Sequence, residues 1–108
     1  MSQVIQIHRA KPIVHIDQKA VKLTRDEHRL LTLLGMMDNR LTPQSFLMDV
    51  LLDGRKPLPG DRYLLWQKIS RLRRKIGAEY VQVNRFHGYI LKGDVQFIGR
   101  PMQKRESR

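Results

Sequence analysis

The first 24 residues alternate short β-branched runs with polar breaks. Residues 4–7 and 13–16 are rich in isoleucine and valine, and the polar segment 17–19 precedes a third short run at 20–23. β-Branched residues favour strands, and polar clusters between such runs favour turns. The pattern predicts three short strands that form a small antiparallel meander.

At Thr24 the hydrophobic period changes from two to between three and four. Leu30, Leu31 and Leu34 recur at helical spacing, which predicts an amphipathic helix over residues 25–37. Thr24 is the expected N-cap. Glu27, three residues later, completes a capping box in which each side chain binds a backbone N–H of the other residue.

Two further helices are predicted after residue 40. Thr42 is the expected N-cap of the second helix, with Pro43 in its first turn, where the missing N–H has no cost. Residues 53–60 contain two prolines and two glycines and therefore form a loop. The third helix is expected over residues 61–76 and ends at Gly77, a typical C-cap.

Strand-like alternation returns near the C-terminus. Residues 80–83 and 89–91 flank a short turn and predict a β-hairpin, and residues 95–98 could add one more strand. Residues 99–108 have no hydrophobic pattern and are expected to fray. The sequence thus predicts one domain over residues 1–98, followed by a basic, flexible tail.

The third helix has two contrasting faces. Leu65, Ile69, Leu72 and Ile76 share one narrow sector of the helical wheel and are expected to face the core. No acidic residue occurs between residues 62 and 78, although like charges at helical spacing repel each other. Phosphates are therefore the expected counter-charges. The opposite face carries Tyr63, Gln67, Ser70, Arg71, Arg74 and Lys75, with Lys68 and Arg73 on its flanks.

Composition supports a polyanionic partner. The 108 residues carry a net charge of +11 and no cysteine. Residues 1–50 hold seven basic and five acidic side chains, net +2, whereas residues 51–108 hold fourteen and five, net +9. This asymmetry favours nucleic acid, with an anionic membrane surface as the second candidate. Because no apolar run reaches the ~18 residues of a membrane span and no signal peptide is present, we expect a cytoplasmic, nucleoid-associated protein.

Three segments resemble one protein family. Residues 23–31 (LTRDEHRLL), residues 69–76 (ISRLRRKI) and Gly88-Tyr89 are similar to the motifs of the OmpR/PhoB-type winged-helix effector domain of bacterial transcription regulators, and such a small chain could also be a phage regulator. The resemblance covers residues 13–91. It implies an α+β winged helix-turn-helix: an N-terminal antiparallel sheet, three helices and a C-terminal hairpin wing.

The resemblance and the side-chain chemistry together suggest a DNA site on the third helix and the wing. Arginine reads guanine and glutamine reads adenine in the major groove, whereas lysine and serine suit phosphates. The expected base-reading residues are Gln67, Arg71 and Arg74. The expected phosphate contacts are Tyr63, Lys68, Ser70, Arg73 and Lys75. The resemblance implies that the wing at 84–88 places Arg85, Phe86 and His87 on the minor groove or its backbone. It also implies that Arg55 and Lys56 lie in the loop with which the family contacts RNA polymerase.

Several features depart from the family pattern. His28 replaces a large apolar aromatic residue and is expected to be a buried, hydrogen-bonded histidine. Phe86 replaces the wing glycine. Trp66 stands where an acidic residue is common and either packs under the loop at 53–60, which we favour, or stacks against a DNA sugar. The family usually carries a receiver domain before this module. Only about twelve residues precede the match here, so we expect a stand-alone regulator rather than an excised domain.

Other function classes find less support in the sequence. The only close histidine–carboxylate pair is His15 and Asp17, and no metal-ligand, phosphate-loop or nucleophile motif occurs. We therefore expect no enzyme activity, cofactor or metal. Two alternative functions stay open. The first is a winged-helix adaptor or inhibitor that acts by protein contact on a transcription complex, and the second is a non-specific nucleoid-type DNA-binding protein. If the protein binds DNA, roughly five to eight phosphate contacts should make its affinity steeply dependent on salt. The resemblance also implies that two copies bind direct repeats as a head-to-tail pair.

Overall fold

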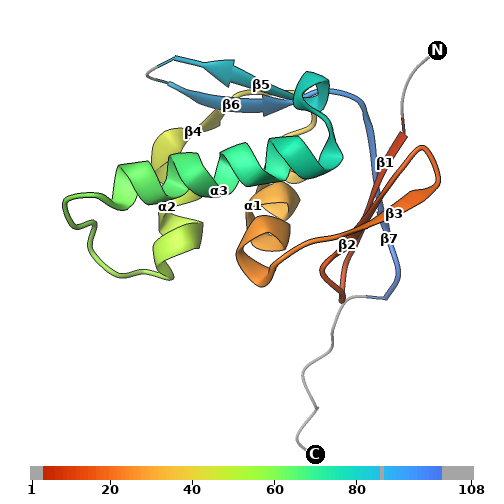
Figure 1. Cartoon of the computed structure of the whole chain (residues 1–108), viewed down its shortest axis with the longest axis horizontal. Helices are drawn as coiled ribbons and strands as arrows, with labels where there is room; N and C mark the ends of the chain where they lie inside the picture. The colour runs from red at the N-terminus through yellow and green to blue at the C-terminus, as the bar shows by residue number, and fades with distance from the viewer. Residues whose placement is uncertain (1–3, 86, 101–108) are drawn as a thin grey trace, which may run out of the picture.

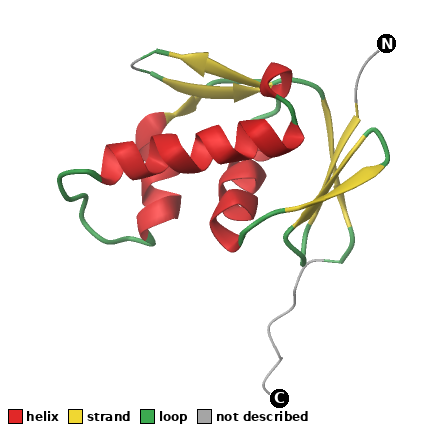
Figure 2. Cartoon of the chain, viewed as in Figure 1, coloured by secondary structure: helices red, strands yellow, loops and turns green. Residues whose placement is uncertain are grey.

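The computed structural model describes residues 4–85 and 87–100. Within these residues, three helices pack against two small β-sheets, one above the helices and one at their end in the view of Figures 1 and 2. In chain order the elements are β1 (Val4–His8), β2 (Ile13–Ile16), β3 (Lys19–Lys22), α1 (Arg25–Met36), β4 (Thr42–Pro43), α2 (Gln44–Leu52), α3 (Asp61–Ile76), the 3-10 turn η1 (Ala78–Tyr80), β5 (Val81–Asn84), β6 (Gly88–Leu91) and β7 (Asp94–Ile98).

The N-terminal sheet contains a strand from the other end of the chain. Its order is β3-β2-β1-β7, and the predicted meander of β1, β2 and β3 is confirmed. β7 pairs with β1 in parallel, from Val4 opposite Asp94 to His8 opposite Ile98. The strand predicted at 95–98 therefore exists and completes this sheet. The two side-chain hydrogen bonds of Asn39 with the backbone of Gly93, 2.8 and 3.0 Å long, hold the turn that leads from β6 into β7.

Helix α1 begins as the sequence predicts. The Thr24 hydroxyl accepts the Glu27 backbone N–H at 3.2 Å, and the Glu27 carboxylate accepts the Thr24 N–H at 2.9 Å, so the capping box is confirmed. His28, one residue further along, is half-buried, and its Nε2 donates to the carbonyl oxygen of His8 at 2.6 Å. This bond confirms that His28 is hydrogen-bonded, but the expected full burial is wrong, because the side chain is only half-buried. The bond ties α1 to the end of β1.

The expected N-cap of the second helix is wrong. Thr42 and Pro43 form β4 and pair with Tyr89 and Gly88 of β6, so α2 begins at Gln44 without a side-chain cap. The Thr42 side chain is completely buried, and within the described residues its hydroxyl has no hydrogen-bond partner. A Thr-Pro pair is compatible with either a helix start or a strand, and here the pairing with β6 makes it a strand.

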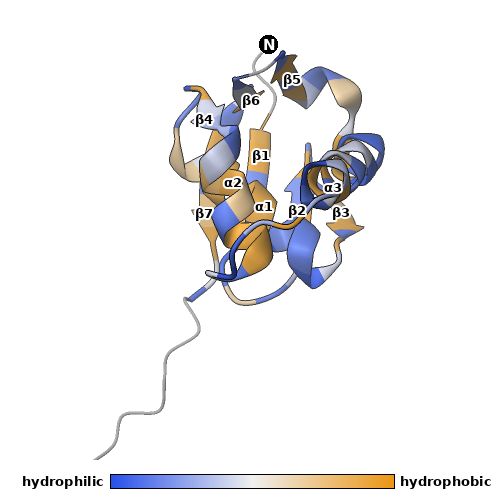
Figure 3. Ribbon diagram, turned by 90° about the vertical axis from the view of Figure 1, so that its left-hand side faces the viewer, coloured by the Kyte–Doolittle hydropathy of each residue, from blue (hydrophilic) through white to orange (hydrophobic). Residues whose placement is uncertain are grey.

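The core lies where the helices meet the two sheets. Leu65, Ile69, Leu72 and Ile76 of α3 are buried, as the helical wheel predicts. In Figure 3, α3 is seen nearly end-on, with most of its hydrophilic residues away from α1 and α2. Within residues 4–85 and 87–100, no helix is both long and apolar enough to cross a membrane.

The β5–β6 hairpin lies alongside α3 (Figure 1). The end of the loop at 53–60 lies on the opposite side of the helices. β4, β6 and β5 form an antiparallel sheet in that order. Three helices with a hairpin beside the third are the winged helix-turn-helix arrangement that the motifs implied. The predicted loop at 53–60 and the predicted end of α3 at Gly77 are also confirmed.

Candidate nucleic-acid interface

One exposed face of α3 gathers the residues expected to read bases. Arg71 and Arg74 are exposed, and Gln67 and Ser70 are half-buried. These four residues, the recognition face, line a shallow hollow together with Trp66. Neither arginine forms an ion pair with any of the described residues. The recognition face therefore presents two guanidinium groups whose charge the fold does not neutralise.

The flank of α3 that faces α1 has protein counter-charges. Lys68 Nζ lies 3.4 Å from Asp26 Oδ2, and Lys75 Nζ donates to Glu27 Oε1 at 2.7 Å. Both acids belong to the first turn of α1. The absence of acids from α3 after Asp61 thus does not mean that all its cations are unpaired, because α1 neutralises two of them.

Glu27 is a buried carboxylate held in its charged form. Only 1% of its side chain is exposed. Burial alone raises the pKa of the Glu27 carboxyl, but the hydrogen bond from Lys75, the backbone N–H of Thr24 and the lysine charge outweigh it. The net pKa lies below its ordinary value. Lys75 therefore has a definite structural role, in addition to any contact it makes with a phosphate.

Arg73 connects α3 to the hairpin. Its Nε donates to the carbonyl oxygen of Val81, the first residue of β5, at 3.1 Å. This bond uses Nε alone, so the two terminal nitrogens of Arg73 do not take part in it. It also fixes the orientation of the hairpin relative to the helix. The recognition helix and the wing are thus held together by a side chain expected to contact phosphate.

Exposed polar residues surround the tip of the hairpin. Arg85 and His87 are exposed, as expected for a wing, and Phe86 lies outside the described residues. The His87 N–H donates to the Asn84 carbonyl at 3.0 Å, and the His87 carbonyl accepts from the N–H of Gln44. The turn at the tip of the wing is therefore bonded to the first residue of α2.

A hollow separates α3 from the wing, and sequence reasoning did not find it. Its walls come from α3, the start of α2 and both hairpin strands, and no motif links these segments. We call it the helix–wing hollow. It is lined by Gln44, Arg62, Trp66, Val83, Asn84, Arg85, Gly88 and Tyr89.

Trp66 lies at the edge of this hollow, with 54% of its side chain exposed. Its ring stacks on Tyr63, which is 61% exposed, with centroids 5.7 Å apart and an interplanar angle of 22°. The favoured expectation, that the loop at 53–60 would cover Trp66, is therefore wrong. The helical spacing of Trp66 turns its ring towards the wing, away from the core.

Comparison with known proteins decides the family. Residues 18–91 match the family described as "Transcriptional regulatory protein, C terminal". The chain belongs to this family. It is a DNA-binding effector domain of the transcription-regulator type, and the motifs at 23–31 and 69–76 lie within the matched residues. None of the curated proteins compared with the chain matches it significantly.

Solved structures of response regulators resemble this effector domain. The C-terminal domain of the nisin resistance regulator NsrR is 26% identical, with a TM-score of 0.65, over 81% of this chain and 89% of that one. The DNA-binding domain of CpxR from E. coli is 25% identical, with a TM-score of 0.59, over 81% and 93%. The RitR mutant C128D, at 21% identity and a TM-score of 0.62, over 75% and 37%, shares the fold.

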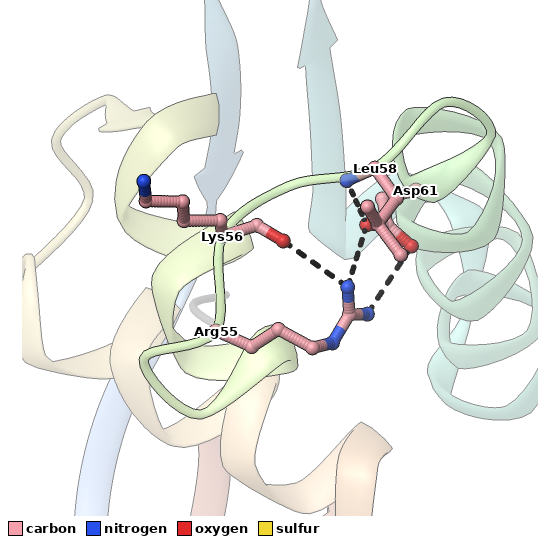
Figure 4. Close-up of polar contacts among 4 residues, drawn as sticks. All are labelled: Arg55, Lys56, Leu58 and Asp61. Carbon is pink, nitrogen blue, oxygen red and sulfur yellow. Dashed lines mark hydrogen bonds and ion pairs between the residues drawn. The ribbon is translucent and has the colours of Figure 1, made fainter.

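The loop before α3 in this effector domain is fastened by one carboxylate (Figure 4). Asp61 Oδ2 accepts the backbone N–H of Leu58 at 2.6 Å and Arg55 Nη1 at 3.2 Å, and Asp61 Oδ1 accepts Arg55 Nη2 at 3.4 Å. These bonds, first that from Leu58 and then that from Arg55, lower the pKa of Asp61. Arg55 also donates to the Lys56 carbonyl, while the Lys56 amine points away from the cluster.

Proposed function

We propose that this effector domain binds specific sequences of double-stranded DNA, with α3 in the major groove and the wing on the neighbouring minor groove or backbone. The observation that carries this proposal is the recognition face, where Arg71 and Arg74 are exposed and unpaired within the described residues beside Gln67 and Ser70. Planar donors in the middle of an exposed helix suit the edges of bases.

The proposed roles differ along the helix. Gln67, Arg71 and Arg74 read base edges. Tyr63, Lys68, Ser70, Arg73 and Lys75 contact phosphates, and Arg62 joins them because it is exposed on the side of α3 that faces the wing. The carboxylates beside Lys68 and Lys75 weaken their contribution, so the arginines provide most of the charge that attracts the backbone.

The wing and the loop have separate proposed roles. Arg85 and His87 contact the minor groove or its backbone, and Phe86 between them stays in the proposal although it lies outside the described residues. Lys56 is the proposed contact of the loop with RNA polymerase, since Arg55 is bonded to Asp61. Two copies would bind direct repeats of DNA as a head-to-tail pair. The protein would be cytoplasmic and associated with the nucleoid.

Selection of genomic fragments tests the proposal. Purified protein is incubated with fragmented bacterial DNA at about 50 and 200 mM salt, and the retained fragments are sequenced. A recurrent motif that survives the higher salt supports a specific regulator. Strong binding without a motif, lost at the higher salt, indicates a nucleoid-type protein instead. Absence of binding at both concentrations contradicts DNA binding and favours an adaptor that contacts protein.

A further inference from the structure

Two exposed aromatic side chains form a ridge on α3. Tyr63 and Trp66 stack on each other, and more than half of each side chain is exposed to solvent. Large exposed aromatic surface is costly in water unless a partner covers it. No residue of the described chain covers this ridge fully, and Trp66 adjoins the two arginines of the recognition face.

Trp66 separates two differently shaped surfaces. On one side it lines the shallow hollow of the recognition face, with Gln67, Arg71 and Arg74 among its neighbours. On the other side it lines the helix–wing hollow, where Arg62 and Arg85 come from opposite walls. Within residues 4–85 and 87–100, the Trp66 indole is the only side chain that lines both of these hollows.

The geometry of DNA relates these two surfaces. A major groove and the neighbouring minor groove are separated by one sugar–phosphate strand. If α3 lies in the first groove and the wing on the second, that strand passes through the helix–wing hollow. Its phosphates would then lie near the guanidinium groups of Arg62 and Arg85, and its deoxyribose carbons near the indole.

We propose that Trp66 packs against a deoxyribose of the DNA strand that runs between α3 and the wing, with Tyr63 supporting the indole from behind and Arg62 and Arg85 binding the flanking phosphates. This inference rests on the proposed function. A deoxyribose is present at every nucleotide and carries no charge. The Trp66 contact therefore strengthens binding to all sequences equally and does not depend on salt.

The chain contains a single tryptophan, so its fluorescence reports on this site alone. The full chain is titrated with a short mixed-sequence duplex at low salt, and acrylamide quenching of Trp66 emission is measured with and without DNA. We expect DNA to reduce the quenching and shift the emission to shorter wavelengths. Binding that leaves the quenching unchanged overturns the inference but leaves the proposed function intact. Absence of binding overturns both.

Three substitutions separate the apolar contact from the ionic ones. Trp66→Ala should weaken binding about tenfold on any duplex, with the salt slope unchanged. Arg62→Ala should instead reduce the slope by about 0.9. Leu58→Ala is the matched control, because Leu58 is exposed to a similar extent, at 60%, but lies in the loop before α3. Loss of affinity in Leu58→Ala equal to that in Trp66→Ala would overturn the proposal.

The contact must also be distinguished from a thymine methyl group, the other apolar group near the edge of a major groove. The duplex is resynthesised with deoxyuridine in place of thymidine, which removes only the methyl groups. We expect the protection of Trp66 to persist. Protection that disappears with the methyl groups would overturn the deoxyribose assignment. Trp66→Phe, which keeps an aromatic ring, should retain most of the affinity and confirm that the fold is intact.

Discussion

Replacing Lys75 by methionine tests whether the ion pair between α1 and α3 stabilises the fold. The substitution keeps the length and apolar stem of the side chain but removes its charge. Glu27 would then remain 99% buried without the donor that lies 2.7 Å from its Oε1. Only the backbone and the side chain of Thr24 would still stabilise its charged form.

The expected cost lies between two limits. A hydrogen bond to a charged group contributes about 1.5–3 kcal/mol, and breaking a fully buried ion pair costs about 3–5 kcal/mol. Lys75 is 37% exposed, so water weakens its attraction to Glu27 and the lower range applies. We expect a loss of about 2 kcal/mol, which lowers the melting temperature of a domain of this size by about 10 °C.

The pH dependence gives this prediction a distinctive signature. The pKa of Glu27 is lowered in the fold, so the stability that it contributes is complete above its unfolded pKa, about 4.3, and is lost as the pH falls through the folded pKa. The difference in unfolding free energy between the wild type and Lys75→Met should therefore be largest near neutral pH and shrink below about pH 4.

Chemical denaturation across this pH range, monitored by circular dichroism, is the measurement. Lys68→Met is the matched control, because Lys68 pairs with Asp26, whose side chain is 36% exposed, and should cost less than about 1 kcal/mol. Equal, small losses in both variants, independent of pH, would refute the structural role of Lys75. A drop in the DNA salt slope without loss of stability would instead identify Lys75 as a phosphate ligand alone.

Three further predictions concern the site and its supports. Arg71→Ala should cost about 1–3 kcal/mol of binding and relax the preference at one base pair of a selected motif; equal losses on selected and scrambled duplexes would contradict base reading. Gly88→Ala should unfold the wing and lower the melting temperature, because the new Cβ would collide with the Thr42 carbonyl; an unchanged melting curve would contradict this. Asp61→Asn should accelerate tryptic cleavage after Arg55 at neutral pH, because it removes the charge that binds Arg55; unchanged cleavage would show that Asp61 does not hold the loop.

Local signals were sufficient for much of the fold. The capping box of Thr24 and Glu27 involves residues three apart, and the buried face of α3 follows from helical spacing alone. Both patterns depend on neighbours in sequence, so they can be interpreted before any tertiary contact is known. The same applies to the polar turn that separates β5 from β6.

Long-range contacts explain what could not be predicted. Nothing in an alternating run at 94–98 says that its partner is β1, some ninety residues earlier, or that the pairing is parallel. Thr42 carries a sound helix-start signal that the pairing with Tyr89 overrides. The helix–wing hollow likewise combines four separate segments, so neither its shape nor the position of Trp66 at its edge follows from any one of them.

The distribution of charge around α3 sets an upper limit on its ionic contribution to DNA binding. The helix contains six basic residues, but α1 neutralises Lys68 and Lys75. With Arg71 and Arg74 directed to bases, Arg62 and Arg73 remain for phosphates, joined by Arg85 of the wing. Three phosphate contacts at about −0.9 each give a log–log salt slope near −3, rising towards −4.5 if the lysines also contribute. A slope of about −4.5 would mean that DNA displaces both lysines from their carboxylates. The stability loss expected for Lys75→Met should then be absent in the DNA complex.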